Sequence, residues 1–207
     1  MNTNTNTLNT KPDGSASVSS ARKSRSTSGT VKLTVCAMFT ALTAICSWIQ
    51  RALPFTPVPV NLATFAVMLS GCILGPVYGT VSQIVYVLLG AVGAPVFSGG
   101  AAGFGIIAGP TGGYIIGYVI LSAVCGFASH THMTNGSAKP SAVRLAAAMM
   151  LGNILLYAAG TAWFMYVTAN DLASSLMMCV MPYLPGDALK MIAGIAIVKR
   201  LPKSLLQ

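Results

Sequence analysis

The most chemically informative residues are Asp187 and Lys190, which stand three positions apart in an otherwise apolar segment of a chain with only three acidic residues. A spacing of three places both side chains on one face of a helix. Ionisable groups within a membrane-length apolar segment are costly unless they are paired or hydrated. The pair therefore predicts either a structural clamp or the floor of a polar binding site, and the residues alone leave both interpretations open.

The composition is that of a membrane protein. Of the 207 residues, 54% are hydrophobic and 7% are charged, and the mean hydropathy is +0.72. The net charge of +9 does not indicate a nucleic-acid partner, because no basic face interleaved with aromatic residues accompanies it. The five cysteines lack CxxC spacing, so we expect neither a metal site nor a disulfide framework. We predict an all-α, multi-pass protein of the cell membrane.

The chain divides into a polar, basic segment (residues 1–30) and an apolar domain (residues 31–203). The first segment is predicted to be a disordered cytoplasmic tail, with a transit peptide as the alternative. In the second, a hydrocarbon core of about 30 Å predicts six membrane-spanning helices, at 33–53, 60–74, 80–96, 112–129, 142–167 and 187–198. Lysines and arginines gather before the first span, between the fourth and fifth, and after the sixth. This distribution predicts that both termini are cytoplasmic.

The connections on the predicted outer side carry most of the helix-breaking residues. Ten of the 28 residues from Gly90 to Gly117 are glycine. Backbone amides in such a loop can bind a polar ligand facing a cavity, and the alternative is that the glycines only turn the chain and pack helices. We favour the cavity.

Several kinds of chemistry are not supported. The sequence contains no G-x-x-x-x-G-K-[ST] phosphate loop and no H-E-x-x-H motif. The two histidines fall on the predicted inner side, away from Asp187, so no Ser, His and Asp set is assembled. We therefore predict no enzyme activity, no cofactor and no metal. In the first span, Ala37 and Ala41 form a small-x-x-x-small pattern, which predicts close approach of another helix from this protein or a partner.

Five sequence motifs in this order resemble the BioY family, the biotin-binding S components of energy-coupling factor (ECF) vitamin transporters. The motifs are PFTPVP at 54–59, Gly75-Pro76 followed by YVLLG at 86–90, GAPVF at 93–97, GPTGGY at 109–114 and PGDALK at 185–190. The chain departs from the family pattern at Asn61 and Ala63, where the family usually shows Thr and Gln.

The resemblance implies a protein that captures biotin from outside and delivers it inward with a transmembrane coupling protein and two ATPase subunits, within membrane lipid. It implies that Asp187 and Lys190 bind the ligand and that Ala37 and Ala41 dock the coupling protein. The hypothesis adds apolar walls formed by Phe55, Val58, Tyr86 and Phe97. It adds further polar contacts from Asn61, Gly99, Gly100, Gly103 and Thr111. An S component for another vitamin and a solo ion-coupled transporter remain the alternatives.

Overall fold

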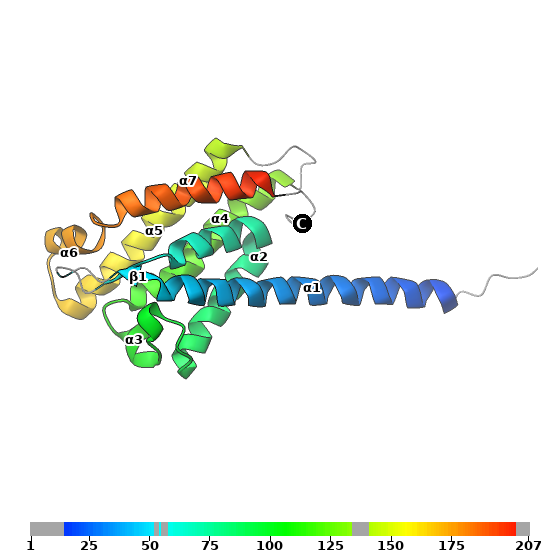
Figure 1. Ribbon diagram of the computed structural model, residues 1–207, viewed down its shortest axis with the longest axis horizontal. Helices are drawn as coiled ribbons and strands as arrows, with labels where there is room; N and C mark the ends of the chain where they lie inside the picture. The colour runs from blue at the N-terminus through cyan, green and yellow to red at the C-terminus, as the bar shows by residue number, and fades with distance from the viewer. Residues whose placement is uncertain (1–14, 52–53, 55–57, 134–140, 202–207) are drawn as a thin grey trace, which may run out of the picture.

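A computed structural model describes residues 15–51, 54, 58–133 and 141–201, with the side chains of these residues apart from 15–28 and 130–133. In this part of the chain, α-helices account for nearly all regular structure (Figure 1). The elements in chain order are α1 (Ser15–Trp48), β1 (Gln50–Arg51), β2 (Val60–Asn61), α2 (Ala63–Val92), the 3-10 turn η1 (Ser98–Gly100), α3 (Phe104–Ala108), α4 (Gly112–Met133), α5 (Ala142–Thr168), α6 (Leu172–Cys179) and α7 (Leu184–Arg200).

Helix α4 lies at the centre of the bundle. Its largest contacts are with α2 and α5, while α1 packs on α2, and α7 packs against α2 and α5. Small residues allow these helices to approach closely. Gly126 of α4 lies against the backbone of Pro76, and Gly117 lies against Leu156 of α5, so a side chain at either glycine would collide. The two-stranded ribbon of β1 and β2 closes the end of the bundle at which α3 and α6 also lie (Figure 1).

Helix α2 reverses direction at Gly75. This residue has φ 79° and ψ −176° and is followed by Pro76, so the helical hydrogen-bond pattern cannot continue through it. Gln83 Nε2 lies 3.0 Å from Ser70 Oγ, whereas a straight helix would separate residues this far apart in sequence by about 20 Å. The two halves of α2 therefore run back along each other, and they correspond to the predicted spans 60–74 and 80–96.

Four of the described helices are long and apolar enough to cross a membrane, or five if α6 and α7, which are bent by 49°, form one span. The mostly helical membrane fold is thus confirmed, while the predicted number of six spans is not established by length and composition. The reason lies in α2, which is continuous in the chain but folded back on itself. Its first half, residues 63–74, is only about 18 Å long.

The predicted tail and the first helix overlap. Helix α1 begins at Ser15, inside the segment 1–30, although the part with membrane-spanning composition begins at Gly29. The disorder of the tail stays a prediction.

Candidate functional site

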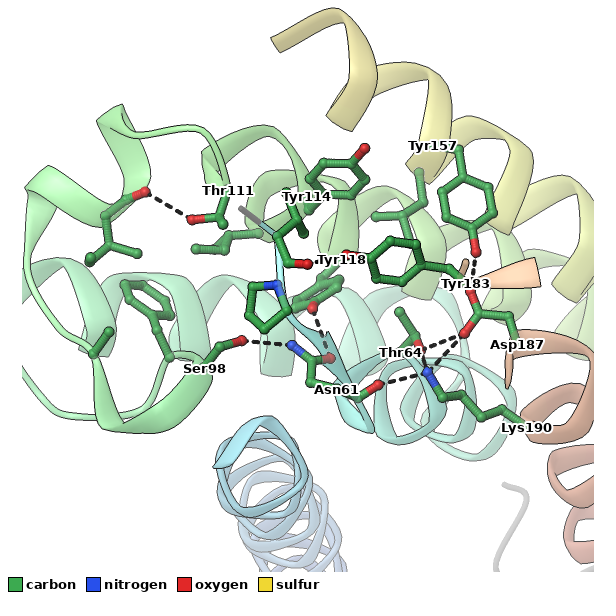
Figure 2. A pocket seen from close by; sticks show the side chains of 17 residues that line it. Asn61, Thr64, Ser98, Thr111, Tyr114, Tyr118, Tyr157, Tyr183, Asp187 and Lys190 are labelled. Atoms are coloured by element: carbon green, nitrogen blue, oxygen red, sulfur yellow. Dashed lines mark hydrogen bonds and ion pairs between the residues drawn. The ribbon is translucent and has the colours of Figure 1, made fainter. Parts of the chain in front are cut away.

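A cavity of about 190 Å³ lies at the end of the bundle closed by the β-ribbon. Figure 2 shows Asp187 and Lys190 at one end, Ser98 and Thr111 at the other, and tyrosine side chains between them. The residues that line it are Val58, Pro59, Asn61, Thr64, Phe97, Ser98, Ala101, Ile106, Thr111, Tyr114, Ile115, Tyr118, Leu156, Tyr157, Tyr183, Asp187 and Lys190. A mostly apolar wall with a few convergent polar groups is typical of small-molecule sites.

The charged pair is on the cavity wall and is almost fully buried. Asp187 lies in the first turn of α7, where the helix dipole favours a negative charge. Its Oδ1 atom is 2.8 Å from Lys190 Nζ, and the side chains are only 5% and 12% exposed, respectively. The ammonium also donates to the carbonyl oxygen of Asn61 at 2.6 Å and to Thr64 Oγ1 at 3.0 Å. All three of its protons are therefore engaged.

Asp187 receives hydrogen bonds from three side chains on three helices. Besides Lys190, the hydroxyl of Thr64 in α2 donates to Oδ1 at 3.4 Å, and the hydroxyl of Tyr157 in α5 donates to Oδ2. A carboxylate has about four acceptor positions, so one remains for a further donor. The arrangement holds the carboxyl group of Asp187 at the cavity with capacity for a ligand N–H.

Asn61 ties the β-ribbon to the neighbouring elements. Its Nδ2 atom donates to Ser98 Oγ at 2.7 Å, and its Oδ1 atom accepts from Tyr118 OH at 3.4 Å. Oδ1 also accepts from the backbone N–H of Ala63 at 3.1 Å, at the start of α2. These contacts set the position of the Asn61 carbonyl group that accepts from Lys190.

Aromatic rings form the middle of the cavity, and glycines make room for them. The ring of Phe97, which is 1% exposed, lies on Gly90, and the ring of Tyr114 lies on Gly160, so a side chain at either glycine would collide. The hydroxyl of Tyr183 donates to the carbonyl oxygen of Val58, which joins the α6–α7 connection to the chain before β2.

The structure brings six of the predicted binding residues together in the lining: Val58, Asn61, Phe97, Thr111, Asp187 and Lys190. Four others are not part of the lining: Tyr86, Gly99, Gly100 and Gly103. Phe55 lies outside the described residues.

Those four residues adjoin the lining in space or along the chain. Tyr86 meets Phe97 edge to face, with ring centroids 5.7 Å apart, and its hydroxyl donates to the carbonyl oxygen of Val96 at 3.1 Å. The three glycines have positive φ angles of 67°, 80° and 96°, which L side chains rarely adopt. Gly99 and Gly100 stand between Ser98 and Ala101, which both line the cavity.

Sequence reasoning missed several polar residues of the lining: Thr64, Ser98, Tyr114, Tyr118, Tyr157 and Tyr183. Tyr114 and Tyr118 have helical i, i+4 spacing, and Tyr183 stands four residues before Asp187, so local periodicity was a usable signal for these three. Tyr157 belongs to no motif, and only the packing of α5 against α7 brings it to Asp187.

The alanines predicted for partner docking lie on a different surface. Ala37 and Ala41 are exposed on α1, whereas Thr40 and Thr43 on the same helix are buried against α2.

Comparison with known proteins gives a consistent result. The sequence model described as the BioY family matches residues 16–207. The chain is 37% identical over 156 residues to "Probable biotin transporter BioY" of Bacillus subtilis (strain 168), covering 74% of this chain and 81% of that protein. It is 33% identical over 166 residues to "Biotin transporter BioY" of Thermotoga maritima, covering 80% and 92%.

A solved structure has the same fold. It is the 2.1 Å crystal structure of the S-component for biotin from an ECF-type ABC transporter, with a TM-score of 0.79 and 29% sequence identity. The match covers 87% of this chain and 98% of the solved one.

Proposed function

The chain belongs to the BioY family, and from that premise we propose that it takes up biotin as the substrate-binding membrane component of an ECF-type transporter. It is a multi-pass protein of the cell membrane. The observation that supports the binding site is the buried Asp187–Lys190 pair on the wall of a largely apolar cavity.

The polarity of the cavity suits the chemistry of biotin. The vitamin has a ureido group with two N–H donors and one carbonyl acceptor, an apolar sulfur-containing ring and a carboxylate at the end of an aliphatic chain. The cavity likewise has polar groups at both ends and aromatic walls between them (Figure 2). Asp187 has acceptor capacity for an N–H donor, which would form a charge-assisted hydrogen bond. Ser98 and Thr111 supply hydroxyl groups at the other end.

The proposed topology has six membrane-crossing segments: α1, the two halves of α2, α4, α5, and α6 with α7. The basic residues Lys32, Arg144 and Lys199 lie at the ends of these segments remote from the cavity, which favours a cytoplasmic position for that face and for both termini. Trp48 and Tyr166, which are 57% and 84% exposed, lie at the cavity end of α1 and α5, as expected for an aromatic belt at the outer interface.

Energy for transport would come from partner subunits. We propose a transmembrane coupling protein and two ATPase subunits, consistent with the ECF-type context of the solved relative. The exposed small residues Ala37 and Ala41 of α1 are the proposed contact, because they permit close approach of another helix in lipid.

Titration of the purified protein in detergent with biotin tests this proposal. We expect tight binding by the wild type and a loss of about 10- to 100-fold in affinity for Asp187→Asn, since a hydrogen bond to a charged group contributes about 1.5–3 kcal/mol. Asp171→Asn is the matched control, because Asp171 is exposed at the start of α6 and outside the cavity.

The proposed function and the proposed binding site are contradicted by different results. A wild-type protein that is folded but does not bind biotin would refute the function. An Asp187→Asn variant with wild-type affinity would remove the pair from the site. Should that variant unfold because Lys190 is left without its counter-charge, the double variant Asp187→Asn/Lys190→Met keeps the test decisive.

A further inference from the structure

The connection from α3 to α4 carries one of the polar groups of the cavity. Thr111 lines the cavity at the end remote from Asp187 (Figure 2) and stands directly before α4, which begins at Gly112. Its hydroxyl donates to the carbonyl oxygen of Ile106 at 3.4 Å. This is a long hydrogen bond, so the hydroxyl can turn toward a ligand. Where the hydroxyl lies therefore depends on what holds the connection in place.

Trp163 of α5 holds this connection from the neighbouring helix. Its indole Nε1 atom donates to the carbonyl oxygen of Gly109 at 3.0 Å, two residues before Thr111. The other described hydrogen bonds of Gly109 are local, since its N–H donates to Ile106 at 3.3 Å and its carbonyl oxygen accepts from the N–H of Gly112 at 3.1 Å. The local bonds shape the turn, whereas Trp163 ties it to a second helix.

The two glycines that follow Thr111 bring the backbone of α4 against the Trp163 side chain. A side chain at Gly113 would collide with Trp163, and one at Gly112 would crowd the indole nitrogen. Small residues allow helices to approach closely in this way. Trp163 therefore fixes the backbone on both sides of Thr111, through Gly109 before it and Gly113 after it.

Trp163 is half-buried and is not part of the cavity lining, so an effect on the ligand must pass through the connection. We infer that Trp163 is a positioning residue for biotin, which holds the connection so that the Thr111 hydroxyl contacts the bound vitamin. This inference rests on the proposed function. A tryptophan that served only as an anchor at the membrane interface would need neither the hydrogen bond to Gly109 nor the contact with Gly113.

Calorimetric titration of the purified full chain with biotin tests this role in a double-mutant cycle. Trp163→Phe keeps a ring beside Gly113 but removes the donor to Gly109. We expect it to lower biotin affinity about fivefold, which is the effect of one neutral hydrogen bond. Thr111→Val removes the hydroxyl and should lower the affinity by a similar factor. The double variant should bind no more weakly than Thr111→Val alone, because Trp163 acts through that hydroxyl.

Trp48→Phe is the matched control. Trp48 Nε1 donates to the carbonyl oxygen of Pro95 at 2.8 Å, so the change removes the same kind of hydrogen bond from another connection at the cavity end of the bundle. That connection is also held by the Tyr86 hydroxyl, which donates to the carbonyl oxygen of Val96 at 3.1 Å. The biotin affinity of Trp48→Phe should therefore stay at the wild-type value.

Fluorescence provides a second measurement, which keeps the test decisive if Trp163→Phe does not fold. The chain has two tryptophans, so Trp48→Phe leaves Trp163 as the sole emitter. Saturating biotin should change the Trp163 emission, and the change should be smaller once Thr111→Val is added, because the contact between the ligand and the connection is then lost.

The positioning role is refuted if Trp163→Phe binds biotin as tightly as the wild type, or if Trp48→Phe weakens binding equally. It is also refuted if the losses of Trp163→Phe and Thr111→Val multiply in the double variant, or if the Trp163 emission does not respond to biotin. A folded wild type that does not bind biotin refutes the proposed function instead.

Discussion

At the scale of single residues, the charges of the site depend on one another. The Lys190 ammonium donates to Asp187, Thr64 and the Asn61 backbone, while Asp187 accepts from Lys190, Thr64 and Tyr157. Removing one member of a buried ion pair leaves the other charge uncompensated, which costs about 3–5 kcal/mol. Variants of either charged residue therefore affect both folding and binding, and a neutral neighbour gives a cleaner test of the site.

Tyr157 is that neighbour. In Tyr157→Phe the ring stays in place but Asp187 Oδ2 loses its only described protein donor. We expect biotin affinity to fall about tenfold, because a hydrogen bond to a charged group contributes about 1.5–3 kcal/mol. The measurement is a calorimetric titration beside Tyr166→Phe, a matched change at a residue of the same helix that is 84% exposed. Equal affinities of the two variants would show that Tyr157 does not help to hold the carboxylate for the ligand.

At the scale of elements, α1 is joined to the second half of α2 by polar side chains. Cys36, Thr40, Thr43 and Ser47 follow one stripe of α1 at helical spacing. Cys36 Sγ and Thr40 Oγ1 donate to the carbonyl oxygens of Tyr78 and Ser82, at 3.4 Å and 2.9 Å, respectively. Thr43 Oγ1 accepts from Gln83 Nε2 at 3.4 Å, and Ser47 Oγ is 3.2 Å from the Tyr86 hydroxyl oxygen. Apolar burial supplies little attraction between helices in lipid, so such hydrogen bonds take a larger part in holding α1 in place.

The hydroxyl of Thr40 tests this interface. Thr40→Val retains the shape of the side chain but removes the hydrogen bond to Ser82, so we expect a loss of about 0.6–1.7 kcal/mol in the free energy of unfolding. Denaturant titration in detergent measures it. Thr34→Val is the matched control, because among the described residues that exposed hydroxyl bonds only to the Thr30 carbonyl of its own helix. A destabilisation by Thr34→Val as large as that by Thr40→Val would contradict the role of the stripe.

At the scale of the whole molecule, the cavity and the proposed docking surface are on different elements. The cavity is lined by residues of β2, α2, η1, α3, α4, α5, α7 and the connections between them, whereas Ala37 and Ala41 lie on the exposed side of α1. Ligand binding and coupling to the energising subunits should therefore be separable by mutation.

Ala41→Trp is expected to leave the biotin affinity of the purified protein unchanged while abolishing biotin uptake by cells, because a large side chain prevents close approach of a partner helix. The matched control is Ile154→Trp on α5, which changes a residue that is 56% exposed away from α1. Copurification with the coupling subunit supplies the second readout. If Ala41→Trp still copurifies with that subunit and supports uptake, the docking surface lies elsewhere.

The family, the helical membrane class and the placement of Asp187 and Lys190 on one helix face were accessible from composition and short motifs. These features are local: a charge in an apolar segment and a spacing of three on one helix are visible in the chain itself. Phe97, Thr111 and Val58 were also predicted from the motifs they belong to, and the structure places them in the lining.

The remaining features of the fold and of the site depended on which helices pack against each other. Tyr157 reaches Asp187 from 30 residues away, Gly75 turns α2 back on itself, and Phe97 occupies the cavity wall in front of Tyr86. These relationships follow from close packing at glycines such as Gly90, Gly117 and Gly126. Spacing along a chain reports neighbours on the same helix, but it does not report the crossing partner, because helices in a bilayer associate through shape and hydrogen bonds made only after they have packed.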